Sequence, residues 1–252
     1  MPARDRDLPP GRTATVVIPV LEPDPNALAL TLDSVARQDF PVEEVIIVDD
    51  SDETVDAEVE DTPVRVIPGE GVGQGRARQI GIEEASGEYI VHLDEDAVML
   101  NESYISSGIA TIESNDGAVA SGGTVLPLHG NVQGDMIAVM DRLNPSTLGT
   151  HHLIHEKRLC ANGGSEACFP VERRGEDITH RNALKERGGI IRMYDQPVMK
   201  DLPTQRQEKG INTILLSVAG GVLSGLVTSA VERGITRYGE DALEAAAEEI
   251  RG

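Results

Sequence analysis

The sequence predicts an α/β fold in which a mostly parallel sheet is flanked by helices. Short, continuous apolar runs recur along the first hundred residues, and stretches with helical spacing separate them. Acidic residues follow directly after several of the apolar runs. Strands that alternate with helices at this pace form parallel sheets with both faces covered, and ligands bind at the carboxyl ends of such strands.

Four apolar runs are expected to be the strands, and they lie at 15–20, 45–48, 64–67 and 89–93. A helix should begin at Asp24-Pro25, because Asp caps a helix well and Pro fits its first turn. A second helix should follow the glycine-rich segment 69–75 and end near Ala85. Pro19, Asp50 and the triplet 94–96 therefore fall at strand ends.

The second half is less regular. Its patterns predict helices at 102–115 and 132–143, strands at 118–126 and 190–193, and an amphipathic stretch that runs from Gly175-Glu176-Asp177 to Gly188-Gly189. In outline, we expect a disordered lead-in at 1–12, a catalytic domain at 13–205 and a C-terminal helical segment at 206–252.

The chain is strongly acidic, with 43 acidic and 22 basic residues among 252 and a net charge of −21. Nucleic-acid binding needs a basic face, so the charge excludes it as a general function. We interpret the acidic charge as a solvated surface suited to high salt, in preference to a surface that binds a basic partner. Such a surface points to a halophilic archaeon or its virus. The two cysteines match no zinc spacing, which fits a reduced, cytoplasmic chain. The first seven residues, MPARDRD, lack the apolar stretch of a signal peptide, so we expect no secretion signal.

Asp94-Glu95-Asp96 is the main candidate site. Carboxylates at the end of a buried strand can converge on one divalent cation, and oxygen ligands suit Mn²⁺ or Mg²⁺. Such a cation stabilises the charge that builds on a nucleoside diphosphate leaving group.

Several motifs in order resemble glycosyltransferase family 2. They are the strand ending at Pro19, the segment 47–51, the runs 76–82, 85–90 and 93–96, and Glu176-Asp177. The resemblance covers about 13–204. It implies an A-type glycosyltransferase fold, which is Rossmann-like, and an inverting transfer from a nucleoside-diphosphate sugar in one displacement.

The resemblance also implies roles for particular residues. Pro19 and Glu22 would border the base and ribose, Asp50 would accept hydrogen bonds from the base, and Arg78 would lie near the nucleotide. Asp96 would bind the metal with support from Asp94, Glu95 would help bind the nucleotide sugar, and Asp177 would be the general base. Two positions depart from the family: Gln79 replaces a usual Asn, and Asp201 stands where a metal-facing His is frequent, as a possible metal ligand.

The acceptor would be a hydroxyl or a polyprenyl or dolichyl phosphate. A sugar nucleotidyltransferase and a catalytically degenerate glycan-binding scaffold of the same fold are the alternatives. The first would normally show a basic, glycine-rich phosphate loop after Pro19, which this chain lacks. Asp96 and Asp177 argue against the second.

Two further features of the sequence bear on its function. In the cluster His151-His152-Leu153-Ile154-His155, the first and last His have a helical spacing. Zinc would need a third ligand, so we expect an acceptor-loop or surface role for this cluster. The uncharged run 211–231 is long enough to cross a bilayer, with a core or interfacial helix as the alternative. It predicts a catalytic domain at the cytoplasmic face of the plasma membrane, or otherwise in the cytoplasm.

Overall fold

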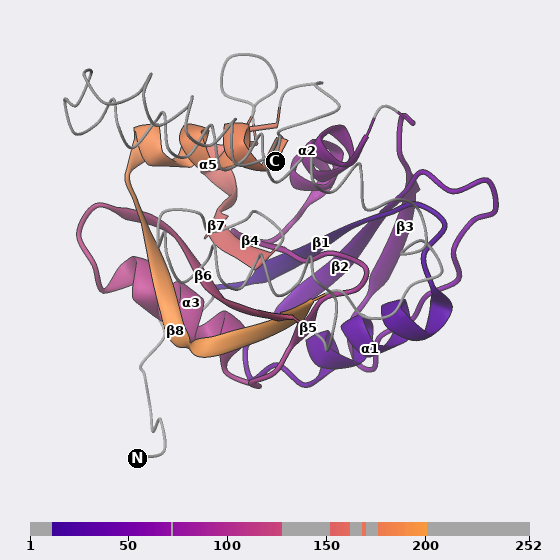
Figure 1. Ribbon diagram of the computed structural model, residues 1–252, viewed down its shortest axis with the longest axis horizontal. Helices are drawn as coiled ribbons and strands as arrows, with labels where there is room; N and C mark the ends of the chain where they lie inside the picture. Colours follow the sequence, from indigo (N-terminus) through magenta and orange to yellow (C-terminus); the bar gives the residue numbers. More distant parts are fainter. Residues whose placement is uncertain (1–11, 72, 128–151, 162–167, 170–175, 201–252) are drawn as a thin grey trace, which may run out of the picture. The chain divides into compact units, whose positions relative to one another are not determined.

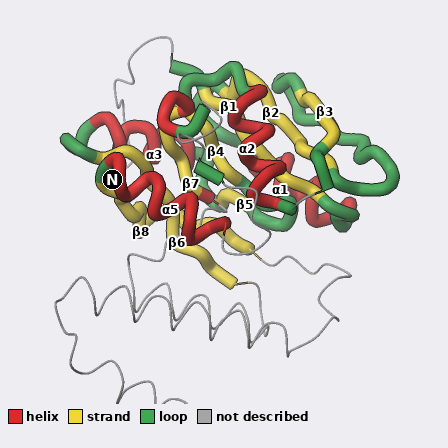
Figure 2. Tube along the Cα trace, turned by 90° about the horizontal axis from the view of Figure 1, so that it is seen from above, coloured by secondary structure: helices red, strands yellow, loops and turns green. Residues whose placement is uncertain are grey.

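The computed structural model describes residues 12–71, 73–127, 152–161, 168–169 and 176–200, and the following account concerns these residues. They form an eight-stranded mixed sheet with the order β3-β2-β1-β4-β7-β6-β8-β5 (Figures 1 and 2). The predicted helix at 132–143, the lead-in before Arg12, Asp201 and the segment 206–252 lie outside the described residues.

The first half of the sheet is parallel, as predicted. It consists of β1 (Ala14–Val20), β2 (Val42–Asp49), β3 (Val64–Pro68) and β4 (Tyr89–His92). Helices α1 (Pro25–Ala36) and α2 (Gln74–Glu84) connect these strands. The Asp24 carboxylate accepts hydrogen bonds from the backbone N–H groups of Asn26 and Ala27, so the predicted cap of α1 is confirmed.

The second half of the sheet is mixed. It contains β7 (Leu153–Glu156), β6 (Ala118–Pro127), β8 (Gly189–Lys200) and β5 (Val98–Met99). Strand β7 pairs antiparallel with both β4 and β6, whereas β6 and β8 are parallel. Helix α3 (Tyr104–Glu113), the 3₁₀ turn η2 (Lys157–Leu159) and helix α5 (Glu176–Arg187) complete the described elements.

Two apolar clusters cover the two faces of the sheet. Helices α1 and α3 bury Leu32 and Ile109 against one face, and helices α2 and α5 bury Ile82 and Leu184 against the other. Successive β1 residues such as Val16 and Val17 belong to opposite clusters, as strand geometry requires. Figure 1 shows α2 and α5 on the opposite side of the sheet from α1 and α3.

Two expectations from the sequence were wrong. Cys160 and Cys168 form a disulfide instead of remaining reduced. His152 and His155, expected in a surface or acceptor loop, are buried, and His155 lies within β7. Strand β7 was missed because its two polar residues hide its apolar alternation. Within the part of the chain that the structure describes, no helix is both long and apolar enough to span a membrane.

Candidate active site

The carboxyl ends of three neighbouring parallel strands meet at one edge of the sheet. Strand β1 lies between β2 and β4, and its last residues pair with the end of β2 at Val20↔Asp49. The backbone N–H of Asp50 donates to the carbonyl of Val20 at 3.0 Å, which joins the two strand ends. Pro19, Asp50 and the triplet that follows β4 are therefore brought to a common edge.

A buried ion pair holds the first residue of the triplet. The Nη2 of Arg78 in α2 lies 2.5 Å from the Oδ1 of Asp94. The Arg78 side chain is fully buried, and Asp94 is only 5% exposed. Removing one partner of such a pair would leave an uncompensated charge, so Arg78 and Asp94 depend on each other. The guanidinium also lies 5.9 Å from the ring centroid of Phe169.

The rest of the triplet sits in a turn that is tied to α1. The backbone N–H of Ala97 donates to the carbonyl of Asp94 at 3.2 Å, and the hydroxyl of Thr31 donates to the carbonyl of Glu95 at 3.0 Å. Thr31 is fully buried, whereas Glu95 and Asp96 are partly exposed. Asp94 is thus held against α2 while Asp96 reaches solvent.

Asp50 is held by the glycine-rich loop after β3. The backbone N–H of Gly71 donates to the Oδ1 of Asp50 at 2.7 Å. A Cβ atom at Gly69 would lie 2.0 Å from the same oxygen, so only glycine allows this approach. Gly71 has a φ of 66°, a conformation that glycine adopts without strain. The loop therefore sets the position of the Asp50 carboxylate, a relation that the sequence analysis did not predict.

Glu22 and the segment after β2 hold each other. The backbone N–H of Glu22 donates to the hydroxyl of Ser51 at 2.8 Å, and the Oε1 of Glu22 accepts from the backbone N–H of Asp52 at 2.9 Å. Glu22 has a φ of 49°, in the left-handed region that side chains rarely adopt. Two reciprocal hydrogen bonds thus fix a strained residue at the end of β1.

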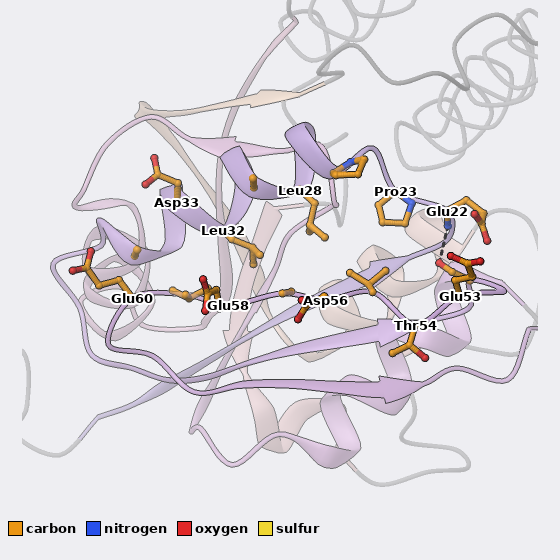
Figure 3. Close-up of a pocket in the computed structure, with 17 residues that line it drawn as sticks. Glu22, Pro23, Leu28, Leu32, Asp33, Glu53, Thr54, Asp56, Glu58 and Glu60 are labelled. Carbon is orange, nitrogen blue, oxygen red and sulfur yellow. Dashed lines mark hydrogen bonds between the residues drawn. The ribbon is translucent and has the colours of Figure 1, made fainter.

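A pocket of about 940 Å³ lies between α1 and the segment 51–60 (Figure 3). Leu28, Leu32 and Val55 line its apolar part. Acidic side chains also line it, namely Glu22, Asp33, Glu53, Asp56, Glu58 and Glu60. The triplet 94–96 does not line this pocket, and the carboxylates that do line the pocket would repel a diphosphate. Of the predicted site residues that the structure describes, only Glu22 belongs to this pocket.

Two predicted positions, Asp177 and Gln79, lie in helices α5 and α2. Asp177 is the second residue of α5, and its side chain and that of Glu176 lie outside the described part. Gln79, which departs from the family pattern, is 1% exposed. Its Nε2 donates to the carbonyl of Cys160 at 2.8 Å, and its Oε1 accepts from the backbone N–H of Phe169 at 3.3 Å. Gln79 therefore ties α2 to the segment that contains the disulfide.

Comparison with known proteins gives one family match. The family described as "Glycosyl transferase family 2" matches residues 15–142, which run from the second residue of β1 past the end of β6 and include all the strand-end residues above. A search of proteins with curated descriptions found no match.

Similar solved structures include two of S. aureus TarS 1–349. The first has a TM-score of 0.56 and 18% identity, and covers 75% of this chain and 60% of that chain. The second, in complex with UDP-GlcNAc, has a TM-score of 0.55 and 17% identity over 79% and 62% of the two chains. The mannosyltransferase PcManGT from Pyrobaculum calidifontis, in complex with GDP-Man and Mn²⁺, has a TM-score of 0.54 and 16% identity over 77% and 58%. The chain thus spans about 60% of the length of TarS 1–349, and these likenesses concern the fold.

Proposed function

The chain belongs to glycosyltransferase family 2, and from this we propose that it transfers a sugar from a nucleoside-diphosphate sugar, with inversion, to an acceptor hydroxyl or a polyprenyl or dolichyl phosphate. One observation carries the proposal. The strand ends of β1, β2 and β4 bring Pro19, Asp50 and the triplet 94–96 to one edge of a parallel sheet. This edge is where α/β sheets bind nucleotides.

In this proposal the metal is Mn²⁺ or Mg²⁺, bound mainly by Asp96. The ion pair with Arg78 supports different roles for the two aspartates, because it engages the Oδ1 of Asp94. Carboxylate oxygens fit both ions. When bound, the ion would stabilise negative charge on the departing diphosphate. Asp201 is a further candidate ligand. The mannosyltransferase from Pyrobaculum calidifontis, whose structure holds GDP-Man and Mn²⁺, supports this choice of ion by analogy.

The nucleotide would lie across the ends of β1 and β2. Asp50, held by Gly71, would accept hydrogen bonds from the base, and Pro19 and Glu22 would border the base and ribose. Glu95 would contact the nucleotide sugar. Arg78 is fully buried, so its contribution there would pass through Asp94 unless the site opens.

Asp177 would be the general base that takes the proton from an acceptor hydroxyl. It is the second residue of α5, after Glu176, in the family-like acidic motif. Asp177→Asn keeps the size of the side chain but cannot accept the proton, so donor binding should persist while turnover falls by ~10² to 10⁴. Wild-type turnover with a hydroxyl acceptor would contradict this role. A phosphate acceptor needs no base, so the test must use a hydroxyl acceptor.

The function itself is tested by a screen of nucleotide sugars. The full chain is assayed for Mn²⁺-dependent binding and slow hydrolysis of UDP-, GDP- and dTDP-sugars, with Asp96→Ala as the inactive control. We expect one nucleotide class to bind and to be hydrolysed only with the metal. Formation of a nucleotide sugar from a sugar phosphate and a nucleoside triphosphate would instead support the nucleotidyltransferase alternative. Binding without any turnover would support the glycan-binding scaffold.

A further inference from the structure

Three histidines gather on the face of the sheet that α2 and α5 cover. His92 ends β4, His155 lies in the adjacent β7 and His180 lies in α5, and all three are fully buried. His155 pairs with Ile90, two residues before His92, so both side chains leave the sheet on the same face. One ring nitrogen of each histidine lies within 4.8 Å of the others.

Hydrogen bonding fixes the protonation of one of these rings. The Nδ1 of His155 lies 2.9 Å from the carbonyl oxygen of Glu156, which can only accept, so this nitrogen carries the proton. In a neutral His155 the Nε2 atom then carries a lone pair and no proton. This atom lies 3.0 Å from the Nε2 of His92. Metal-binding histidines typically donate their other N–H to a backbone carbonyl in this way.

Unlike His155, His180 makes no hydrogen bond within the described part of the chain that would account for its buried ring nitrogens. Both of its ring nitrogens are buried without a hydrogen-bond partner among the described residues, although buried polar atoms nearly always have one. Its ring stacks on Phe169 at a centroid distance of 4.0 Å, and the rings of His92 and His155 lie at 5.0 and 5.3 Å. Aromatic packing accounts for the ring but leaves both nitrogens unsatisfied.

The surroundings favour neutral rings. Burial lowers the pKa of His155 to about 4. Burial, with repulsion from His92, His155, Arg78 and Arg187, lowers the pKa of His180 well below its usual value. Neutral imidazole is the form that binds metals. The positive charge of Arg78 is balanced by Asp94, and Glu156 and Arg187 act on His155 with opposite signs.

We propose that His92, His155 and His180 are the ligands of a divalent transition-metal ion, with Zn²⁺ as the expected occupant. The 3.0 Å between two Nε2 atoms is close to the ~3.3 Å that bonds of about 2.0–2.1 Å give in a tetrahedral zinc site. Imidazole nitrogens select zinc-like ions, whereas the carboxylates at 94–96 suit Mn²⁺ or Mg²⁺. Cys160 and Cys168 also lie near His180, but their sulfurs are bonded to each other and are therefore not thiolate ligands.

Such an ion would join three elements that bear the candidate active site. It would tie β4, which leads into the triplet 94–96, to α5, which begins at Glu176-Asp177, through β7 between β4 and β6. The site is distinct from the proposed Mn²⁺ site, and its metal would have a structural role.

The test uses the full chain without reductant. Because the rings are buried, the protein is unfolded with guanidinium and a chelator, then refolded with millimolar Mg²⁺ and with or without Zn²⁺. We expect one zinc per chain to remain after desalting, measured by elemental mass spectrometry. With Co²⁺ in place of zinc, we expect the visible absorption of a four-coordinate site with three nitrogen ligands and a water, without sulfur charge-transfer bands.

His180→Gln should lower zinc affinity by at least ~100-fold, the upper end of what losing an outer-shell partner costs. The matched control is His152→Gln, since His152 is also buried but its Nε2 lies 3.1 Å from the carbonyl oxygen of Gly123, away from the cluster. This control should keep wild-type zinc content. No readout involves a nucleotide or sugar, so failure here is distinguishable from failure of the proposed function.

Three results would overturn the proposal. They are no zinc in the refolded wild-type chain, equal zinc in His180→Gln and the wild type, or cobalt bands that show sulfur ligation. If His180→Gln does not refold, the wild-type zinc content and cobalt spectrum still decide the question.

Discussion

Glu44 is a carboxylate that the fold buries almost completely. It accepts hydrogen bonds from the backbone N–H of Ser86 at 2.7 Å, from the Ser86 hydroxyl at 2.5 Å and from Arg65 at 3.0 Å. Burial alone would raise the pKa of Glu44, but these hydrogen bonds and the charge of Arg65 outweigh it and lower the pKa below that of an ordinary glutamate. The ionised carboxylate therefore joins β2 to the turn after α2 and to β3.

Glu44→Gln should lower the free energy of unfolding by ~1–3 kcal/mol near pH 7, because the substitution weakens several hydrogen bonds to a buried group. A group whose pKa is lowered by folding contributes stability above its unfolded pKa and loses it as the pH falls through the folded pKa. The difference from wild type should thus be largest near neutral pH and shrink as the pH falls through the lowered pKa of the folded state. Denaturant unfolding curves recorded across this pH range measure the difference in free energy of unfolding.

The exposed neighbour Glu43 supplies the control, and Glu43→Gln should be close to neutral. A Glu44→Gln cost that grows as the pH falls from 6 to 3 would contradict this account.

At the residue scale, the sequence predicted where the site lies but not how it is held. Asp50 and the triplet 94–96 could be located because each follows a continuous apolar strand. The hydrogen-bond partners of these residues could not be predicted, because the partners lie far away in the sequence. Gly71 approaches Asp50 across 21 residues, and Arg78 approaches Asp94 across 16. The role of Arg78 toward a nucleotide stays a prediction.

At the scale of elements, helix α2 packs unusually close to β1. A Cβ atom at Gly81 would lie 2.3 Å from the Cγ1 of Val17 and 3.3 Å from a methyl carbon of Val48. Glycine is a poor helix former, so its presence in the third turn of α2 reflects this contact and not helix propensity.

Gly81→Ala sets two effects against each other. Alanine gains up to about 1 kcal/mol in helix propensity, whereas overpacking a core typically costs ~1–3 kcal/mol. We expect net destabilisation, measured by denaturant unfolding. In a Val17→Ala background the clash is relieved, so the same substitution should become neutral or stabilising. An equal cost in both backgrounds would show that the contact does not set the packing of α2.

Helices and strands with a clear pattern of apolar residues were predicted from the sequence, whereas short or interrupted strands were not. The four parallel strands and helices α1, α2 and α3 were expected from apolar runs and caps. Strand β5 has two residues, and β8 was expected only at 190–193. In β8 the register with β6 shifts after Met193, and Tyr194 is 71% exposed before Pro197 resumes the pairing. This bulge breaks the apolar pattern, so sequence alone ends the strand too early.

At the scale of the whole molecule, the uncharged run 211–231 follows the elements that form the proposed active site. We propose that it anchors the enzyme at the cytoplasmic face of a membrane, where a lipid-phosphate acceptor would be available. A chain truncated after Gln207 should be recovered without detergent and keep donor binding, but lose efficiency toward a lipid acceptor because its local concentration falls. Membrane fractionation and donor titration measure both effects.

The alternative is that this run packs in the core of the protein. Truncation would then expose apolar surface and cause aggregation. Recovery of the full-length protein entirely in the soluble fraction, without detergent, would also rule out the anchor.

The central claim is that the carboxylates after β4 bind a metal that holds the nucleoside diphosphate. Calorimetric titration with UDP and GDP, with and without Mn²⁺, tests it in the wild type, in Asp96→Ala and in the exposed control Asp116→Ala. For the preferred nucleotide, Mn²⁺ should raise the affinity of the wild type and of Asp116→Ala by ~10-fold or more, which is about 1.4 kcal/mol. Asp96→Ala should lose this increase while its thermal unfolding stays cooperative. Equal affinity with and without Mn²⁺ in all three proteins would contradict the claim.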